Sequence, residues 1–453
     1  MTYLNKLKLL SRERILNSIK VSITKDVMFT LLNSFWRIIS GPVTLLFIPL
    51  FLTSETQGFW YTFMSLSALT IFADLGFTTI VTQFSAHEFA HLTLNKETGL
   101  FEGDEIAIKR IGSLFRFVMK WSLTVGAIGF PIILCIGFVM FQGKSLHVNW
   151  VLPWCIFILS SGLSFANGTM LSFFEGCGQI AAIEKNKLIG SILATISVLT
   201  LLYFGFNLYS LAITTLLNII VNISLLYVRF GKLIFQIIKV SKNFTANWKA
   251  DFLRLIWKYA LSWSSGYFIF QIYTPLMFHF HGPVEAGRVG ISVALVTAAF
   301  SIANVWLYVA NPKLNMLASL RDWGAMDKLL AKSLALSVLT FSIGASFVLL
   351  FIYFFPHLAI LERFLGIVPM SYLFGSWVLL IVISGLALYL RAHKEEPMVV
   401  ISILTAIYIV ITTFLVIKYM PPKYLFLGFL TAQILGLPAT IAVFIKKRRE
   451  WHT

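Results

Sequence analysis

The sequence predicts an all-α polytopic membrane protein with about twelve transmembrane helices, in two six-helix bundles around a central cavity. The chain of 453 residues is 58% hydrophobic and only 12% charged, about half the charged share of roughly 25% in soluble domains. Its mean hydropathy is +0.84, and apolar runs of about 20 residues, long enough to cross a bilayer, recur along its length. Polar residues inside these runs recur in matching positions of the two halves.

Twelve apolar runs divide the chain. They cover residues 28–52, 59–84, 117–141, 150–174, 188–206, 208–228, 259–280, 289–309, 333–355, 368–390, 398–417 and 424–445. The fifth and sixth runs are nearly fused, so the count could be off by one. A basic linker at 229–258 separates a first bundle at 28–228 from a second at 259–445. Basic segments at 1–27 and 446–453 complete the division.

The placement of lysine and arginine predicts the orientation. If the N-terminus is cytoplasmic, the cytoplasmic segments and adjoining helix ends hold 30 of the 36 basic residues, and the outer connections hold five. The remaining one, Arg37, lies inside the first span. Cytoplasmic loops are enriched in Lys and Arg, so both termini are predicted to be cytoplasmic. This topology accounts for the net charge of +17 without a nucleic-acid partner.

The loops give no sign of an enzyme. All outer connections are short, and no connection is large enough for a folded catalytic domain. The three cysteines, Cys135, Cys155 and Cys177, are scattered and form neither a disulfide framework nor a metal-binding spacing. Gly-rich phosphate loops and a supported Ser-His-Asp spacing are also missing from the sequence. We therefore expect no enzymatic activity, no cofactor and no metal.

One short sequence motif matches that of zinc proteases and needs a separate explanation. The stretch "SAHEFAHL" contains His87, Glu88 and His91 in the H-E-x-x-H pattern of a zinc-binding helix. It lies at the cytoplasmic end of the second span, where a helix emerges into the headgroups, and no third ligand follows at a recognisable spacing. Motif matches without their structural context are mostly false. We interpret these residues as interfacial histidines beside a helix-end carboxylate.

Polar side chains inside the spans form helical stripes in the first two spans of each half. The stripes are Asn33, Arg37, Ser40 and Thr44; Ser67, Thr70, Asp74 and Thr78; Ser264, Tyr267, Gln271 and Thr274; and Thr297, Ser301, Asn304, Tyr308 and Asn311. A single stripe is as well explained by polar contacts between helices as by a cavity. Four stripes in matching positions favour a shared polar cavity.

Two charges lie within these stripes. A buried charge in the middle of the membrane costs several kcal/mol without a partner. Arg37 and Asp74 are nine and ten residues from the inner ends of their spans, so they lie at nearly the same depth. Either the two side chains pair with each other, or both face the cavity.

The stretch "PLFLTSETQGFWYTFMSLSALTIFADLGFTTIVTQFSAHEFAHL" and the following "GLFEGDEIAIKRIGSLFRFVMKW" resemble Wzx-type polysaccharide (O-antigen) flippases. This family belongs to the multidrug/oligosaccharidyl-lipid/polysaccharide exporter superfamily. The likeness rests on a Gly-aromatic pair, a mid-span Asp-Leu-Gly and the Q-F-x-x-H-E ending of the second span. It implies twelve helices forming a V around a central cavity, in a bacterial inner membrane.

The resemblance also implies a substrate, an undecaprenyl-pyrophosphate-linked glycan of O-antigen or lipopolysaccharide synthesis. It would be moved from the cytoplasmic to the periplasmic leaflet by alternating access, in the presence of membrane lipid and in association with glycan assembly proteins. A guanidinium is well suited to a pyrophosphate, which makes Arg37 the first candidate for binding. The further candidates are Asn33, Arg288, Lys120, Gln271 and Asn304, with Arg116 and Lys258 weaker.

Two questions stay open at this point. Asp74 could take up H⁺ or Na⁺ in an antiport cycle, or it could neutralise Arg37. The alternative function is a multidrug or small-molecule exporter of the same fold, for which an anionic cavity would be expected. Arg37 favours the lipid-linked glycan.

Overall fold

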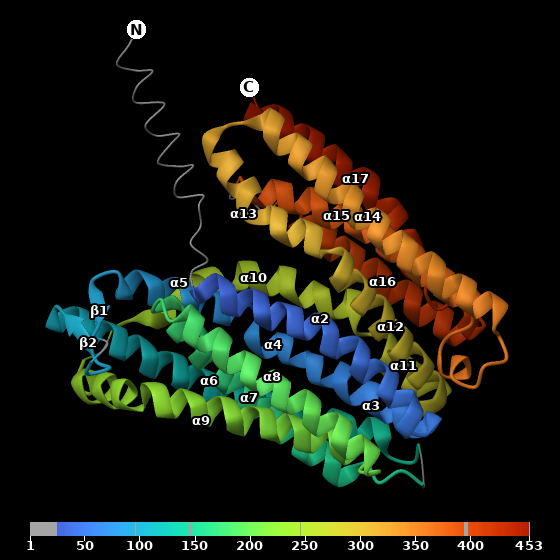
Figure 1. The fold of residues 1–453 in the computed structure, drawn as a ribbon, viewed down its shortest axis with the longest axis horizontal. Coiled ribbons are helices and arrows are strands. Elements are labelled where there is room, and N and C mark those ends of the chain that lie inside the picture. The colour runs from blue at the N-terminus through green and yellow to red at the C-terminus, as the bar shows by residue number, and fades with distance from the viewer. Residues whose placement is uncertain (1–24, 96, 145–146, 245, 394–396, 453) are drawn as a thin grey trace.

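The computed structural model describes residues 25–452 except 96, 145–146, 245 and 394–396, and the predicted N-terminal segment lies almost wholly outside these residues. The described chain is nearly all helical, which confirms the predicted fold class (Figure 1). A hairpin of two short antiparallel strands, β1 (Leu92–Leu94) and β2 (Phe101–Gly103), follows the second span.

The helices follow the apolar runs, and most of them extend beyond these runs. They are α2 (Lys25–Phe51), α3 (Ser54–Ser67), α4 (Ile71–Asp74), α5 (Phe77–Phe89), α6 (Glu105–Phe141), α7 (Val151–Gly176), α8 (Ile180–Tyr203), α9 (Leu208–Ser241), α10 (Trp248–Phe270), α11 (Tyr273–His281), α12 (Pro283–Ala303), α13 (Val305–Leu320), α14 (Trp323–Phe354), α15 (Ile367–Arg391), α16 (Val399–Tyr419) and α17 (Leu427–His452). Short 3-10 turns, η1 (Ala68–Thr70), η2 (Leu361–Arg363) and η3 (Pro422–Tyr424), join some of them.

The number of spans is close to the prediction. Ten helices of the described chain are long and apolar enough to cross a membrane, and a bent pair, Ser54–Asp74 with Phe77–Phe89, supplies an eleventh. The expected span at 259–280 is divided between α10 and α11. The fifth and sixth runs form two separate helices, α8 and α9. The chain is therefore a multi-pass membrane protein.

The second span is broken where the sequence predicted a continuous helix. Leu75 and Gly76 adopt left-handed backbone conformations, with φ of 46° and 79°, and the two parts of the span meet at 44°. A non-glycine residue at positive φ is uncommon because its Cβ crowds the backbone. Hydropathy reports residue type and not backbone angle, so the predicted run did not show this break.

The seventh span is also broken, and here proline gives the reason. Pro275 lies in the first turn of α11, and it has no amide hydrogen to donate to the carbonyl of Gln271 four residues earlier. Gln271 ends α10, and its carbonyl oxygen accepts a hydrogen bond from the hydroxyl of Ser65 on α3. The break in the second half is thus stabilised by the first half.

The helices form two groups that meet at one end and diverge at the other. In Figure 1, α2–α9 form the lower group and α12–α17 the upper group, with α10 and α11 between them. We call the end where α3 meets α11 and α12 the closed end, and the end that carries the β1–β2 hairpin the open end. The bundle boundaries predicted from the sequence stay predictions.

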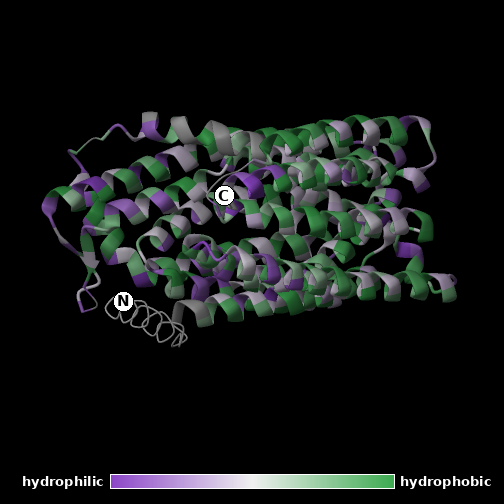
Figure 2. Cartoon of the chain, turned by 90° about the horizontal axis from the view of Figure 1, so that it is seen from above, coloured by the Kyte–Doolittle hydropathy of each residue, from purple (hydrophilic) through white to green (hydrophobic). Residues whose placement is uncertain are grey.

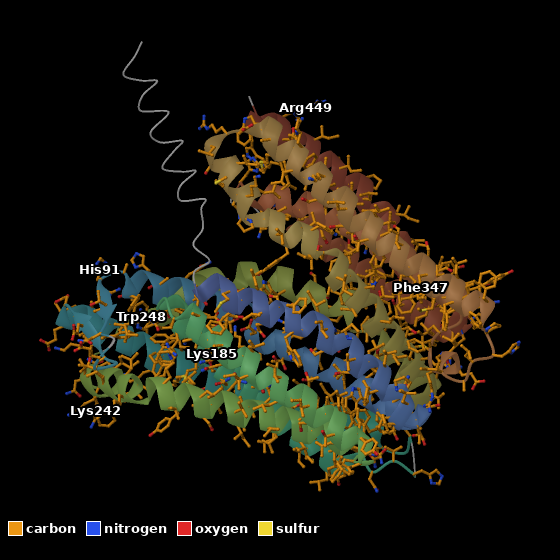
Figure 3. All side chains as sticks on the ribbon, in the orientation of Figure 1. His91, Lys185, Lys242, Trp248, Phe347 and Arg449 are labelled. Carbon is orange, nitrogen blue, oxygen red and sulfur yellow. The ribbon has the colours of Figure 1, made fainter. Side chains whose placement is uncertain are left out.

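Hydropathy differs along this axis. Figure 2 shows hydrophobic residues along much of the helices' length, whereas hydrophilic residues gather near the end that carries the hairpin and in the loops at the opposite end. In Figure 3, His91, Trp248 and Lys242 lie at the open end of the lower group, and Arg449 lies at the diverging end of the upper group. The open end is therefore rich in the basic segments predicted to be cytoplasmic.

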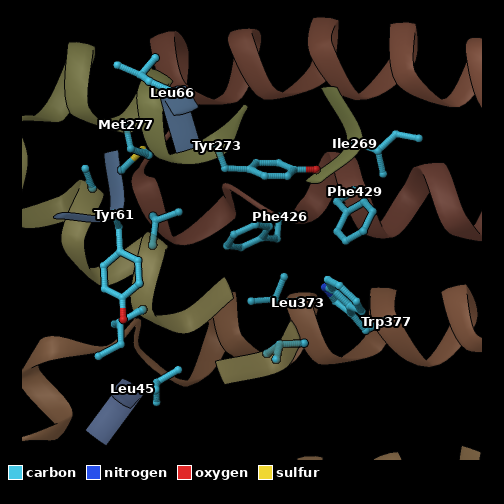
Figure 4. Packing of buried hydrophobic residues seen from close by; sticks show 14 of the residues in the cluster. Leu45, Tyr61, Leu66, Ile269, Tyr273, Met277, Leu373, Trp377, Phe426 and Phe429 are labelled. Carbon is cyan, nitrogen blue, oxygen red and sulfur yellow. The ribbon is translucent and has the colours of Figure 1, made fainter. Parts of the chain in front are cut away.

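The largest of three apolar core clusters in the described chain extends across the junction of the two groups. It includes Leu45 and Tyr61 from the first half and Tyr273, Leu373 and Phe426 from the second (Figure 4). Burying side chains of this size removes large apolar areas from contact with lipid and water and fills the space between the helices closely. The core therefore holds the two halves together in this arrangement.

At the closed end, α3 and α12 approach at backbone distance. A Cβ atom placed on Gly58 would lie 1.8 Å from the carbonyl oxygen of Pro283. The amide nitrogen Nε2 of the adjacent Gln57 donates to the backbone oxygens of Gly287 at 3.0 Å and Arg363 at 3.2 Å. Small residues allow such close helix contacts in membranes. The "T-Q-G" stretch of α3 thus closes this end.

Candidate functional site

A cavity of about 650 Å³ lies between the two halves. Its lining comes from α2, α3, α8, α9, α12 and the α10–α11 break. The polar lining residues are Arg37, Ser40, Thr44, Tyr61, Ser65, Thr195, Thr214, Gln271, Thr274, Thr297 and Ser301. Three of the four predicted stripes therefore contribute to one cavity, and the stripe of the second span does not.

A second space of about 720 Å³ continues the first one between α2 and the α12–α13 junction. The two spaces share Arg37, Ile38 and Ser301. Most of the second lining is apolar, for example Leu32 and Phe35 on α2. Arg37 therefore lies where the first space meets the second, which we call the apolar groove although Ser34, Asn304 and Tyr308 also line it.

Arg37 is the one charged residue in the described lining of either space, and no carboxylate is among the lining residues. Its side chain is exposed, and within the part of the chain that the structure describes it has no ion-pair partner. Pro42, one turn later on α2, lacks the amide that would bond the carbonyl of Ile38, and both residues also line the cavity. The helix thus presents a free guanidinium beside an interrupted turn.

Asn33 has a different position from the one expected. It is buried, at 6% exposure, and its Nδ2 donates to Oε2 of Glu184 on α8 at 2.8 Å. Lys187 links Glu184, at 2.9 Å, to Glu175 at the end of α7. Asn33 is not among the cavity-lining residues. It connects α2 to a charged network that single-sequence reading did not identify.

Asp74 does not pair with Arg37 in this arrangement. Its Oδ1 accepts from the backbone N–H of Thr78 and its Oδ2 from the Thr78 hydroxyl, both at 3.1 Å. The first amides of a helix lack helical acceptors, and a negative charge is favourable at this end. The Asp-Leu-Gly sequence therefore breaks the span and restarts it as α5. Neither the neutralising role nor a place in the cavity lining is observed.

This position of Asp74 predicts how its variants behave. Asp74→Asn should retain transport, because its amide group can accept from the Thr78 N–H and donate to the Thr78 hydroxyl. Asp74→Ala should lower the stability of the detergent-solubilised protein by about 0.5–2 kcal/mol, the usual cost of losing such a helix-start acceptor. Thermal unfolding and a transport assay measure both. Complete loss of transport in Asp74→Asn, with unchanged stability, would restore the ion-uptake role.

Gln271 and Asn304 lie at helix breaks beside the cavity. Gln271 lines the first space together with Thr274, and its Oε1 lies 3.5 Å from the Ser65 hydroxyl. Asn304 separates α12 from α13 and lines the apolar groove. The structure thus places Gln271 in the lining of the first space and Asn304 in that of the second, and Arg37 lines both.

The other predicted cations lie elsewhere. Arg288 is at the closed end, where it pairs with Glu285 at 2.7 Å and donates to the carbonyl of Glu362 at 2.9 Å. Lys120 is exposed on α6 and lines neither space. The structure therefore does not bring Arg288 or Lys120 into the cavity.

The two weaker candidates do not reach it either. Arg116 donates to the carbonyls of Ser241, Lys242 and Phe244, which fastens the end of α9 to α6. The side chain of Lys258 lies outside the described residues.

The H-E-x-x-H residues have a packing role. Glu88 is buried and receives two hydrogen bonds from Arg110 on α6, at 2.8 and 2.7 Å. His87 is exposed, and α5 ends before His91. The guanidinium of Arg110 also lies 5.4 Å from the Trp248 ring centroid at the start of α10. The carboxylate thus joins α5, α6 and the linker.

Four hydroxyls of the cavity were not predicted from the sequence. Tyr61 and Ser65 come from α3, Thr195 from α8 and Thr214 from α9. None of them belonged to a predicted stripe, and Ser and Thr are tolerated in membrane helices at little cost. Only the folded structure shows that these hydroxyls line one cavity.

Comparison with known proteins supports the fold. No protein-family model and no curated protein matches the sequence. Among solved structures, an inward-facing multidrug resistance MATE family transporter of the MOP superfamily superposes with a TM-score of 0.57 at 13% identity, over 90% of this chain and 99% of that one. The lipid II flippase MurJ, in an inward closed conformation, superposes with a TM-score of 0.58 at 13% identity, over 92% and 87%.

A third similar structure is a MOP superfamily transporter from Pyrococcus furiosus, whose reversed binding-pocket polarity suggests a different function. Its TM-score is 0.55 at 12% identity, over 95% of this chain and 96% of that one. The chain therefore has the fold of MOP superfamily transporters.

Proposed function

We propose that the chain is a flippase that moves an undecaprenyl-pyrophosphate-linked oligosaccharide across a bacterial inner membrane, from the cytoplasmic to the periplasmic leaflet. The observation that carries this proposal is the charge of the cavity. Arg37 is the sole charged residue in its described lining, and no carboxylate accompanies it. A cavity of this kind favours an anion. The function is transport, without covalent chemistry on the substrate.

The two parts of the cavity fit the two parts of such a substrate. A guanidinium can bind two phosphate oxygens at once, in a fixed planar geometry. The hydroxyls and amides of the first space, such as Thr195 and Gln271, offer hydrogen bonds to sugars. The apolar groove along Leu32 and Phe35 is suited to a prenyl chain that extends toward the bilayer. Arg37 lies between the two.

The arrangement of the helices supports an alternating-access cycle. The two halves meet through the Gly58 contact at the closed end and diverge at the other end. The open end carries the basic segments predicted to be cytoplasmic, so the conformation described is one that loads substrate from the cytoplasm. Export would require the α3–α12 contact to separate.

A multidrug exporter of the same fold is the alternative. Cationic drugs would be attracted by carboxylates in the cavity, and the described lining contains a cation instead. The Pyrococcus furiosus transporter illustrates that pocket polarity differs among proteins of this fold. The charge at Arg37 favours the glycan lipid.

The two functions can be separated with purified protein in proteoliposomes. One arm measures how fast a fluorescent prenyl-diphosphate-linked sugar becomes accessible to a membrane-impermeant quencher. The other arm measures transport of a cationic dye. We expect the protein to transport the diphosphate-linked lipid across the bilayer and not to transport the dye. Dye transport without lipid movement would establish the alternative and end the proposal.

A further inference from the structure

A second groove lies on the outside of the molecule, away from the central cavity. It measures about 520 Å³ and is formed by α6 and the end of α11. Its lining is Pro131, Ile132, Cys135, Ile136, Val139, Met140 and His279. All of these except His279 come from α6, and His279 belongs to the second half. The groove therefore runs along the junction of the two halves near the closed end.

This groove faces the lipid phase. Val139 is 81% exposed, and Ile132 and Ile136 are also exposed, within a helix that is apolar enough to cross the membrane. In a bilayer such side chains contact hydrocarbon. Beside the groove, Phe141 of α6 packs edge-to-face on Phe278 of α11, with ring centroids 5.3 Å apart. Both rings are fully buried, so the protein interior beside the groove is filled at this contact.

A lysine lies at the closed end, just after the last residue of α6. Lys144 follows α6, and its Nζ donates to the backbone oxygen of His279 at 2.6 Å. The ammonium group has three donors, and no carboxylate pairs with it among the residues that the structure describes. The imidazole of His279 itself, on α11, is exposed. An apolar groove thus ends at an unneutralised positive charge, at the level predicted for the outer headgroups.

We infer that this groove binds an anionic glycerophospholipid of the surrounding bilayer. One acyl chain lies along α6 between Pro131 and Met140, and the headgroup phosphate lies against Lys144 and His279. Because these two residues come from different halves, the bound lipid bridges them and stabilises the conformation in which the closed end is shut. This site is separate from the Arg37 cavity, and the inference does not depend on the transported substrate.

Native mass spectrometry of the full chain in a mild detergent tests this inference. The protein is mixed with phosphatidylglycerol or with phosphatidylcholine of the same acyl chains, and retained lipid is counted. We expect phosphatidylglycerol to be retained about tenfold more, because the choline ammonium of phosphatidylcholine offsets the phosphate charge and is repelled by Lys144. Lys144→Gln should reduce this preference to less than about twofold. Cys135→Phe, which fills the groove at an exposed free cysteine, should reduce retention of both lipids.

Lys423→Gln is the matched control. Lys423 lies in another outer connection, with its Nζ 5.1 Å from the Tyr424 ring centroid, and it does not line the groove. Its replacement should leave the preference unchanged. Equal retention of both lipids by the unmodified protein would overturn the inference, and so would a preference that survives Lys144→Gln. The lysine variant is decisive even where Cys135→Phe does not fold.

Discussion

Replacing Gly58 with leucine should abolish transport and lower the stability of this conformation more than any other single exchange considered for this chain. The new Cβ would lie 1.8 Å from the carbonyl oxygen and 2.5 Å from the carbonyl carbon of Pro283. These are backbone atoms, so the overlap is relieved only if α3 and α12 move apart. Overpacking of a close contact usually costs about 1–3 kcal/mol or more. Thermal unfolding and the transport assay measure the two effects.

Gly344→Leu provides the control for this exchange. A Cβ on Gly344, in the middle of α14, would meet no atom within 4 Å, so the same change of side chain should be tolerated there. If Gly58→Leu kept both the unfolding temperature and the transport rate of the unmodified protein, the two halves would not meet as described.

Replacing Arg37 with alanine should abolish glycan-lipid transport while the protein still inserts and folds. Losing a charge-assisted contact costs roughly 1.5–3 kcal/mol, about ten- to a hundredfold in binding. Arg37→Lys should retain part of the activity, because it keeps the charge without the planar fork. Lys120→Ala removes an exposed lysine outside the cavity and should leave transport unchanged. Complementation of a flippase-deficient strain, with membrane levels of each variant measured, compares them.

The double variant Arg37→Ala with Asp74→Asn separates two roles of the arginine. If Arg37 served only to neutralise Asp74, removing both charges would restore transport. In the structure Asp74 is held by Thr78 instead, so the double variant should remain inactive. A fully active double variant would leave Arg37 without a role in binding.

The sequence was sufficient for the fold class because the bilayer imposes a simple rule. A spanning helix needs about 20 apolar residues, and this rule found the helices and separated α8 from α9. It did not find the break at Leu75, whose φ of 46° leaves no trace in composition. The break before Pro275 was open to prediction, since a proline within an apolar run cannot donate the helical hydrogen bond to the carbonyl four residues earlier.

The candidate site was predictable in part. Arg37 was identifiable because a lone charge in an apolar span has few explanations other than a cavity or a partner. The neighbours of Asn33 and Arg288 were not identifiable, because Glu184 is 151 residues from Asn33 and Glu362 is 74 residues from Arg288. Spacing along one helix says which residues share a face. The packing of the whole chain decides which helix that face contacts. This is why neither Asn33 nor Arg288 lines the cavity, although the sequence had predicted that both would.

The central claim is that the cavity binds a diphosphate through Arg37, and equilibrium binding to purified protein tests it most directly. Undecaprenyl pyrophosphate is compared with undecaprenol, which has the same chain and no phosphate, for the unmodified protein and for Arg37→Ala. We predict that the diphosphate binds at least about tenfold more tightly than the alcohol, and that this difference vanishes in Arg37→Ala. Equal binding of diphosphate and alcohol, or an advantage that Arg37→Ala leaves intact, would contradict the claim.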